Sequence, residues 1–383
     1  MRLRIGIDYT AAVQQRAGIG RYTRNLVRAL AAIDRENEYV LFAAVGGGRP
    51  VDEDWPSNFR VRSAPLSDRT MAILWHRLRV PLPIEAFIGP VDLFYSPDFV
   101  LPPTRARTVL TVHDLSFIRV PECADPNLRA YLNKAVPRSV HRADLVLADS
   151  QNTKDDLVEL LGVNPQRIEV IYPGVEERFR PIEDQALLEN VRRRYDLPAR
   201  FILGLGTLEP RKNFLRFIEA FASLQVGKFA SLHLVIAGRP GWLYEGIFAA
   251  VERLGLEGKV AFPGFIADED LPALYNLAEL FVFPSLYEGF GLPPLEAMAC
   301  GVPVVASNSS SLPEVVGEAA LTVDPMDVKG LAEAMGRLLD DGALRKRMIE
   351  RGLERARTFT WEGAARKLVS VYNGLAFAGV HGC

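Results

Sequence analysis

The 383-residue sequence contains little cysteine and has no excess of charge of one sign. Its three cysteines, Cys123, Cys300 and Cys383, are far apart and odd in number. That pattern is typical of reduced thiols and excludes a disulfide framework. The 45 Lys and Arg residues nearly balance 47 Asp and Glu residues, which leaves a formal net charge of -2. A dedicated nucleic-acid binder has a strong basic excess, so we expect no nucleic-acid partner.

Segments that carry a chain to or through a membrane are also missing. The N-terminus has a short apolar run without the length of a signal peptide, and no window reaches about 18 consecutive apolar residues. We therefore expect a cytoplasmic protein. One basic amphipathic stretch, residues 69–79, fits peripheral contact with the inner membrane surface or a lipid-linked acceptor, and equally fits a core helix with a polar face.

What the sequence does contain is a regular alternation of short apolar runs and segments of helical periodicity, typical of βαβ units and parallel sheets. With 49% hydrophobic and 24% charged residues, the composition is that of a globular protein. Two series of strands are predicted. They comprise residues 3–7, 40–44, 93–95, 108–112, 145–148 and 168–171, then 201–206, 232–237, 260–262, 280–283, 302–306 and 320–323. We predict an α/β protein with two doubly wound domains, residues 1–180 and 181–362, with ligands beyond the carboxyl ends of the strands.

The most informative segment lies between residues 281 and 301. A strand ends near Phe283, a loop with Gly289 and Gly291 follows, and two prolines suit the first turn of a helix. The glycines let the backbone approach a ligand, and the helix N-terminus supplies free N–H groups, so this is a cradle for a phosphate or diphosphate. Glu288 and Glu296 flank it, and carboxylates accept paired hydroxyls of a sugar or ribose. The alternative is that Glu296 only complements the helix dipole and Glu288 is solvated.

This segment, Glu-Gly-Phe-Gly-Leu-Pro-Pro-Leu-Glu at residues 288–296, resembles the retaining glycosyltransferases of family 4. Further similar motifs extend over nearly the whole chain, at residues 201–213, 235–238, 263–266, 311–315 and 359–361. The resemblance implies a GT-B architecture, in which two Rossmann-like domains face a central cleft. It also implies that the C-terminal domain binds most of the nucleotide sugar, and that a final helix, residues 363–383, crosses back to the N-terminal domain.

Roles in the second domain follow from the resemblance. Glu288 would be catalytic and hold the hydroxyls of the donor sugar, and Glu296 would bind the ribose diol. Arg211 and Lys212 would neutralise the diphosphate, although many relatives have an arginine at the position of Thr207; a solvated basic turn is the alternative. Backbone groups would make the other contacts. The sugar and diphosphate would be bound by the backbone of Gly289, Phe290, Gly291 and Leu292, and the base by the backbone of Phe265 and Ile266.

The first domain has two candidate positions. Gly20 follows the first predicted strand in a loop that lacks the third glycine of a dinucleotide fingerprint and resembles the first glycine loop of the family. His113 and Asp114 come directly after the strand at residues 108–112. The resemblance implies that both are catalytic. His113 would contact the transferred sugar, and Asp114 would orient it or organise the loop, whereas a structural histidine is the alternative.

Metal-binding patterns are weak in this sequence. Asp268-Glu-Asp270 has the spacing of an Asp-x-Asp motif, but its place before a helix predicts an N-terminal cap instead. No cluster has the spacing of zinc ligands. We therefore expect neither a metal nor another cofactor, with the nucleotide sugar as a substrate.

The predicted reaction is transfer of a hexose from a nucleotide-sugar donor to a hydroxyl of a glycan or lipid-linked acceptor, with retention of configuration. The overall pattern is most similar to mannosyltransferases of polysaccharide or O-antigen assembly, which implies GDP-mannose as donor and leaves UDP-glucose and UDP-N-acetylglucosamine open. Two other classes also stay open. They are a sugar-nucleotide epimerase or phosphorolytic enzyme of the same fold, and a non-catalytic glycan-binding relative.

Overall fold

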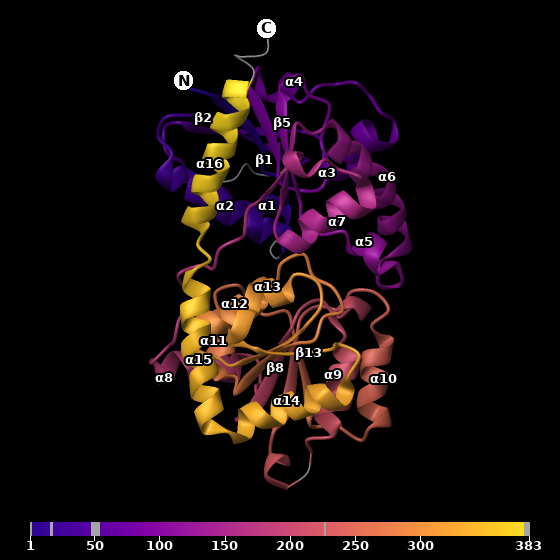
Figure 1. Cartoon of the computed structure of the whole chain (residues 1–383), viewed down its shortest axis with the longest axis vertical. Helices are drawn as coiled ribbons and strands as arrows, with labels where there is room; N and C mark the ends of the chain where they lie inside the picture. Colours follow the sequence, from indigo (N-terminus) through magenta and orange to yellow (C-terminus); the bar gives the residue numbers. More distant parts are fainter. Residues whose placement is uncertain (1, 16–17, 47–53, 226, 379–383) are drawn as a thin grey trace. The chain divides into compact units, whose positions relative to one another are not determined.

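The computed structural model describes residues 2–15, 18–46, 54–225 and 227–378 (Figure 1). The chain divides into two compact units. The first unit comprises residues 1–115, 127–174 and 360–383, and the second comprises residues 116–126 and 175–359. The predicted boundaries, after residues 180 and 362, take no account of the segment 116–126. That segment is tied to the second unit by the Trp242 indole, whose Nε1 donates to the carbonyl of Cys123 at 2.7 Å.

The first unit is built on a seven-stranded parallel sheet of order β3-β2-β1-β4-β5-β6-β7. The strands are β1 (Arg4–Asp8), β2 (Glu38–Ala44), β3 (Phe59–Ala64), β4 (Leu93–Ser96), β5 (Arg107–Val112), β6 (Leu145–Ala148) and β7 (Ile168–Val170). The sequence does not predict β3. This edge strand has Arg60 and Arg62 exposed to solvent, so it lacks the continuous apolar run of the inner strands.

Helices cover both faces of this sheet. They are α1 (Thr10–Gln14), α2 (Ile19–Ile33), α3 (Asp68–Ala72), the π-helix η1 (Ile73–Arg77), α4 (Glu85–Ile88), α6 (Pro126–Arg142), α7 (Gln151–Leu161), η3 (Pro165–Arg167) and α16 (Trp361–Ala378). On one face, Ile5 and Ile7 of β1 share a core cluster with Leu26 of α2 and with Leu368 and Tyr372 of α16. The last helix therefore packs beside α2 as part of the first unit (Figure 1).

The second unit contains a six-stranded parallel sheet of order β10-β9-β8-β11-β12-β13. Its strands are β8 (Phe201–Leu205), β9 (His233–Ala237), β10 (Val260–Gly264), β11 (Leu280–Phe283), β12 (Val304–Ser307) and β13 (Leu321–Val323). Its longer helices are α8 (Gln185–Arg194), α9 (Phe214–Ala222), α10 (Glu245–Arg253), α11 (Leu271–Leu277), α12 (Leu292–Ala299), α13 (Leu312–Val316), α14 (Val328–Asp340) and α15 (Gly342–Arg357). The short ones are α5 (Ser116–Arg119), η2 (Pro121–Cys123), η4 (Pro210–Lys212), η5 (Gly227–Phe229) and η6 (Gly317–Ala319).

Both sheets reverse their strand order once. The reversal falls between β1 and β4 in the first sheet and between β8 and β11 in the second. Loops that leave two such neighbouring strands diverge, and they open a crevice where doubly wound proteins bind ligands. The prediction of two doubly wound α/β units is confirmed, and the topology directs attention to the loops after β1, β4, β8 and β11.

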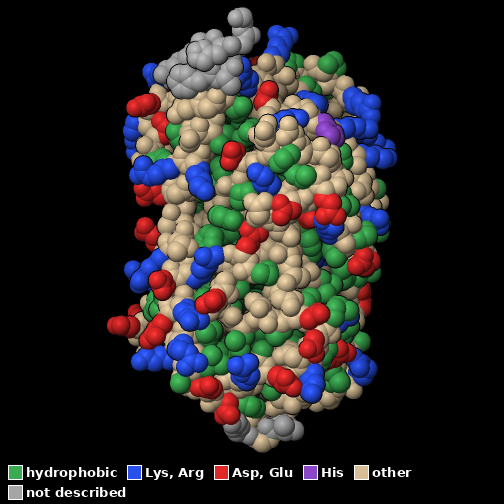
Figure 2. Space-filling view, in the orientation of Figure 1, with side chains coloured by type: hydrophobic (Ala, Val, Ile, Leu, Met, Phe, Trp, Pro, Cys, Tyr) green, Lys and Arg blue, Asp and Glu red, His purple; other side chains and the backbone are tan. Residues whose placement is uncertain are grey.

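The surface carries no single dominant charge on the face shown in Figure 2. Basic and acidic side chains are interspersed there, in keeping with the balanced composition. In the part of the chain that the structure describes, no helix combines the length and the apolar character needed to cross a bilayer.

Candidate functional site

The loops that follow β8 and β11 meet at the point where the second sheet reverses. The N–H of Leu286 donates to the carbonyl of Arg211 at 2.8 Å. Asn213, in a left-handed conformation with φ of 58°, donates from Nδ2 to the carbonyl of Pro284 at 2.9 Å and to that of Pro325 at 2.7 Å. These contacts fix the basic turn η4 against the glycine loop, although 76 residues separate Lys212 from Glu288 in the sequence.

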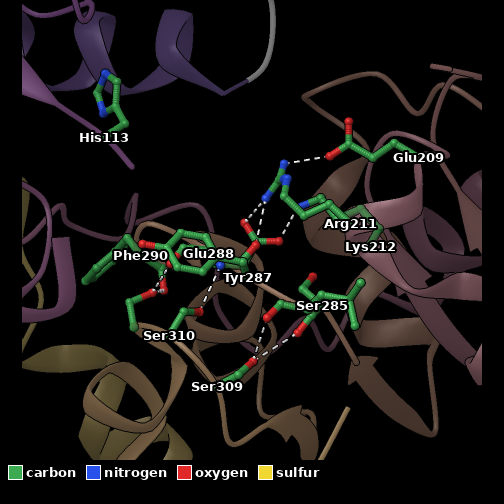
Figure 3. A network of polar contacts seen from close by, with 12 residues as sticks. His113, Glu209, Arg211, Lys212, Ser285, Tyr287, Glu288, Phe290, Ser309 and Ser310 are labelled. Atoms are coloured by element: carbon green, nitrogen blue, oxygen red, sulfur yellow. Dashed lines mark hydrogen bonds and ion pairs between the residues drawn. The ribbon is translucent and has the colours of Figure 1, made fainter. Parts of the chain in front are cut away.

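Glu288 lies between the two predicted cations (Figure 3). Lys212 Nζ donates to Glu288 Oε1 at 2.6 Å, and Arg211 Nη1 donates to Oε2 at 2.9 Å. Arg211 also donates to the carbonyl of Tyr287 at 3.0 Å, and Lys212 lies 4.8 Å from the centre of the Phe283 ring. The structure thus joins three side chains that the sequence predicts as one site.

The charges in this cluster determine the protonation state of Glu288. Glu288 is only 8% exposed, and burial by itself would raise the pKa of its carboxyl group. The opposing charges of Arg211 and Lys212, with the hydrogen bond from Lys212, outweigh burial and lower the pKa of Glu288 to about 2. The carboxylate is therefore ionised at every physiological pH.

A second carboxylate, Glu209, completes the cluster. Its Oε1 accepts from Arg211 Nη2 at 2.6 Å, and the residue is 3% exposed. Arg211 is therefore held by two carboxylates, which fixes its guanidinium in one orientation. Glu209 is not among the predicted site residues, although it lies within the motif at residues 201–213.

Serines after β12 support the backbone of the glycine loop. The N–H of Glu288 donates to Ser310 Oγ at 2.8 Å (Figure 3). Ser311 Oγ donates to the carbonyl of Glu288 at 2.9 Å and lies 2.7 Å from that of Phe290. Ser309 Oγ donates to the carbonyl of Leu286 at 3.0 Å. The sequence does not predict Ser309 and Ser310 as part of the site, and Ser311 is noted only as the first residue of the motif at residues 311–315. Their signal is a run of three hydroxyl residues beyond a buried strand, which by itself indicates only a loop.

The glycine loop predicted as a phosphate cradle lies directly before α12. Gly291 precedes the helix with φ of 116°, a conformation that L side chains rarely adopt. The ring of Phe290 is buried, and its centre lies 5.6 Å from that of Phe359. Leu292 opens the helix, and its turn brings together the backbone of the four residues Gly289 to Leu292.

The remaining predicted residues of this unit are either more buried than Glu288 or lie farther from its cluster. Glu296 is 2% exposed, and its Oε2 accepts from the hydroxyl of Tyr275 at 2.9 Å. Phe265 and Ile266 follow β10, which is two strands, or about 10 Å, from β8. The Arg239 guanidinium lies 4.4 Å from the centre of the Phe265 ring, and the Ile266 side chain is buried. The structure does not join these two residues to the Glu288 cluster.

In the first unit, His113 follows β5 and is buried among polar and aromatic partners. Nδ1 lies 2.6 Å from Asp149 Oδ2, and Nε2 lies 2.8 Å from the carbonyl of Pro97. The rings of Tyr22 and Phe99 pack edge-on against it at 4.8 and 5.3 Å. A carbonyl and a carboxylate both accept, so both ring nitrogens carry hydrogen and the imidazole is a cation.

The environment of His113 supports that protonation state. Burial lowers the pKa of the ring, but the charge and hydrogen bond of Asp149 raise it more, to about 9. The residue that holds Nδ1 is Asp149, at the end of β6, whereas the sequence assigns an orienting role to Asp114. Asp149 is not predicted, because it lies 36 residues away along the chain and only the pairing of β5 with β6 brings it close.

Gly20 lies in the first turn of α2. A Cβ atom at this position would lie 2.0 Å from the carbonyl oxygen of Gln15 and 2.8 Å from that of Ala11. The backbone of α1 and its following turn therefore leaves no room for a side chain. Close packing alone requires glycine here, independently of any ligand.

Family models match both halves of the chain. Residues 190–355 match the model described as glycosyl transferases group 1, and residues 16–179 match the model of glycosyltransferase family 4. The O-antigen chain mannosyltransferase B of Escherichia coli is 35% identical over 370 residues, which cover 93% of this chain and 95% of that relative. The chain belongs to the group 1 glycosyl transferases. It is a hexosyltransferase that uses a nucleotide-sugar donor.

Other comparisons agree with the assignment of this chain to the glycosyltransferases. The serotype-specific mannosyltransferase WbdA of Escherichia coli is 37% identical over 276 residues, 70% of this chain but only 34% of that relative. Sucrose-phosphate synthase from Thermosynechococcus elongatus has a TM-score of 0.77 at 23% identity, with 98% of this chain and all of that one covered. WaaG, a glycosyltransferase of lipopolysaccharide biosynthesis, has a TM-score of 0.72 at 18% identity, with 96% and 99% covered. The fold is GT-B.

Two further predictions concern metals and thiols. Asp270 is the N-cap residue of α11, as predicted, but its side chain makes no capping hydrogen bond. Its Oδ2 accepts instead from Arg194 at 2.7 Å and from the Tyr195 hydroxyl at 2.8 Å. Among the described residues, no group of His, Cys, Asp and Glu side chains could hold a metal ion. Cys123 and Cys300 are free and buried, and Cys383 lies outside the described residues.

Proposed function

We propose that the enzyme transfers mannose from GDP-mannose to a hydroxyl of a glycan or lipid-linked glycan, with retention of the anomeric configuration, during synthesis of a cell-surface polysaccharide. The observation that carries the proposal is the contact of Glu288 with both Arg211 and Lys212 beside the N-terminus of α12. The choice of mannose is supported by the name of the full-length relative from Escherichia coli, an O-antigen chain mannosyltransferase.

The chemistry of the proposed donor site is electrostatic. As the bond from the sugar to the diphosphate breaks, negative charge grows on the departing oxygens. Arg211, Lys212 and the N–H of Leu292, the one residue with an N–H in the first three of α12, are positive groups already fixed in place. They stabilise that charge without reorganisation. In the proposed mechanism, the leaving diphosphate removes the acceptor proton on the same face of the sugar.

Glu288 retains acceptor capacity for a sugar in this arrangement. An ionised carboxylate has about four lone-pair sites, and Arg211 and Lys212 each occupy one. We assign the remaining capacity to hydroxyls of the donor sugar. A diphosphate would share the two cations with Glu288, so sugar and phosphate binding are coupled through one carboxylate.

His113 has a different role in this proposal from that of a general base. Both ring nitrogens already donate to protein acceptors, and a cation has no lone pair with which to take a proton. We propose that His113 is a fixed positive group next to the transferred sugar, and that Asp114 organises the loop behind it. Asp149 is the positioning residue that holds the ring.

The other predicted residues keep supporting roles in the proposal. Glu296 would bind the ribose diol after rearrangement of its contact with Tyr275, and Gly20 would let the backbone approach the donor phosphate. The backbone of Phe265 and Ile266 would contact the base, while that of Gly289, Phe290, Gly291 and Leu292 would contact the diphosphate. We propose no metal and no other cofactor for the reaction.

The location proposed is the cytoplasm, with or without peripheral contact with the inner membrane surface through residues 69–79. Met71 and Trp75 of this stretch are buried in a core cluster, which supports the core-helix alternative, whereas Leu78 is 63% exposed. Flotation of the purified protein with anionic vesicles distinguishes membrane contact from the core-helix alternative, because a membrane-bound enzyme would float and an unbound one would stay in the dense layer.

A panel of nucleotide sugars tests the function. Each sugar is scored by thermal shift, since a ligand of the native state raises Tm, and by turnover with and without a mannose-containing acceptor. We expect GDP-mannose to give the largest shift and an α-linked product by NMR. Preference for a UDP-sugar would contradict the donor, a β-linked product would contradict retention, and release of an epimerised sugar nucleotide or a requirement for inorganic phosphate would favour the alternative enzyme classes.

A further inference from the structure

The first unit contains a cavity of about 370 Å³ that none of the assignments above uses. It lies at the carboxyl ends of β1, β2 and β4, where the strand order of the first sheet reverses. Asp8 and Ala44 line it from the last residues of β1 and β2, and Asp98 lines it from the loop after β4. The volume falls in the range of small-molecule sites, about 300–1,000 Å³. We refer to it as the acidic cavity.

The acidic cavity borders both sequence motifs of this unit. Ile19, the neighbour of Gly20 in the first turn of α2, forms part of its wall. Phe99 forms another part, and its ring lies 5.3 Å from the imidazole of His113. A ligand in the cavity would therefore lie beside the position that the proposed function gives to the transferred sugar.

Three carboxylates line the cavity, those of Asp8, Asp68 and Asp98, and among the described residues no Lys or Arg side chain does so. Asp8 Oδ1 accepts from the N–H of Thr10 at 3.0 Å. For the carboxylates of Asp68 and Asp98, no donor is found in the described part of the chain. Both therefore retain their full capacity to accept hydrogen bonds from a ligand.

Burial makes these carboxyl groups more difficult to ionise, and a ligand with a negative charge would make their ionisation more difficult still. It raises the pKa of Asp8 to about 6, and it also raises the pKa of Asp98, against the charge of His113. His76, another lining residue, is neutral, because burial and the charge of Arg142 lower its pKa to about 4. The described lining residues thus include three carboxyl groups and no cation, so an added negative charge would be buried without a counterion.

The rest of the wall is apolar and aromatic. Trp75 is fixed by donation from its Nε1 to the carbonyl of Leu82 at 2.8 Å, and Tyr131 packs edge-on against His76 at 6.2 Å. Phe42 and Met71 are buried beside them. Rigid apolar surface combined with unpaired acceptors suits a sugar ring, which has apolar C–H faces and a rim of hydroxyl donors.

We propose that the acidic cavity binds an uncharged sugar unit of the acceptor and discriminates against phosphorylated sugars. This inference rests on the proposed function for the identity of the reaction. Hydroxyl groups of a neutral glycan satisfy the carboxylates of Asp68 and Asp98, whereas a phosphate would be buried next to like charges. The acceptor class is therefore a neutral glycan end and not a sugar phosphate.

Direct binding tests the inference without turnover. Binding of methyl α-mannopyranoside and of mannose 6-phosphate to the full-length protein is measured by saturation-transfer NMR, with and without GDP. We expect the neutral glycoside to bind at least about tenfold more tightly than the phosphate. Asp98→Asn and Asp68→Asn should each lower the affinity for the neutral glycoside about tenfold, which is the effect of losing a hydrogen bond to a charged group. Each should also reduce the ratio of the affinity for the glycoside to that for mannose 6-phosphate.

Controls separate this result from the proposed function. Asp155→Asn changes an exposed carboxylate on α7 and should leave affinity for the glycoside unchanged. Asp68 is at the exposed rim, so its variant tests the idea even if Asp98→Asn fails to fold. Equal affinity for the two probes, or undiminished glycoside affinity in both variants, would overturn the inference. Hydrolysis of GDP-mannose by the wild-type enzyme tests the donor proposal separately.

Discussion

Lys212 Nζ donates to Glu288 Oε1 at 2.6 Å. The contact joins the residue predicted to neutralise a diphosphate to the residue predicted to hold the sugar. With Arg211 on the other carboxylate oxygen, the site contains a preformed charge network instead of separate subsites.

Removal of the Glu288 carboxylate should affect both activity and stability. Glu288→Ala leaves Arg211 and Lys212 with side chains only 19% and 12% exposed and without their shared counterion. Because buried charges that lose a partner are costly, we expect a loss of about 2–4 kcal/mol of unfolding free energy, and turnover lower by orders of magnitude. Glu288→Gln keeps the shape of the side chain and removes only its charge. Comparison with Glu288→Ala therefore distinguishes the effect of the charge from that of packing. Near-normal turnover of the purified Glu288→Ala enzyme would refute its assignment.

Lys212→Ala should lower kcat more than it alters the fold. Arg211 still neutralises Glu288 in this variant, but one positive group facing the leaving diphosphate is lost. By analogy with the loss of one preorganised donor, we expect kcat to fall about 10²- to 10³-fold. Lys329→Ala, which removes a lysine with an 87% exposed side chain on α14, is the matched control and should retain wild-type kinetics. A kcat within a few-fold of wild type for Lys212→Ala would remove Lys212 from the donor site.

The His113–Asp149 pair should make stability depend on pH. The folded pKa of His113, about 9, lies above its ordinary value of 6.5, so the folded state binds the proton more tightly. The resulting stability is fully present below pH 6.5 and is lost as pH rises through 9; it amounts to about 3 kcal/mol. Denaturant unfolding of wild type and Asp149→Asn across pH 6–10 measures this. The difference between the two proteins should shrink as pH rises, and a constant difference would mean that His113 is not a cation in the folded enzyme.

Gly291 should tolerate no side chain. At φ of 116°, Gly291→Ala would be strained, and its Cβ would lie 2.7 Å from the buried Leu312 side chain. We expect a loss of about 1–3 kcal/mol in unfolding free energy together with weaker donor binding, because the start of α12 must shift. Gly246→Ala, on α10 with no atom within 4 Å of the new Cβ, is the control and should be neutral or slightly stabilising. Unchanged thermal stability of Gly291→Ala would contradict the prediction.

Local pattern is sufficient for much of the fold and part of the site. Buried parallel strands such as β6 and β11 are continuous apolar runs, and a glycine loop followed by two prolines marks the start of α12. These signals depend on neighbours within a few residues. The sequence by itself therefore determined the two doubly wound units and identified Glu288 beside a glycine loop, whereas Arg211 and Lys212 became candidates through the resemblance to family 4.

Only the tertiary structure decided which groups meet. Asp149 reaches His113 because β6 pairs with β5, and the serines at 309–311 reach the glycine loop because β12 pairs with β11. The acidic cavity likewise draws Asp8, Asp68 and Asp98 from three separate loops or elements. The physical reason is that periodicity and turn chemistry act over a few residues, whereas the partner of a buried polar group is chosen by strand order, which brings together side chains that are tens of residues apart.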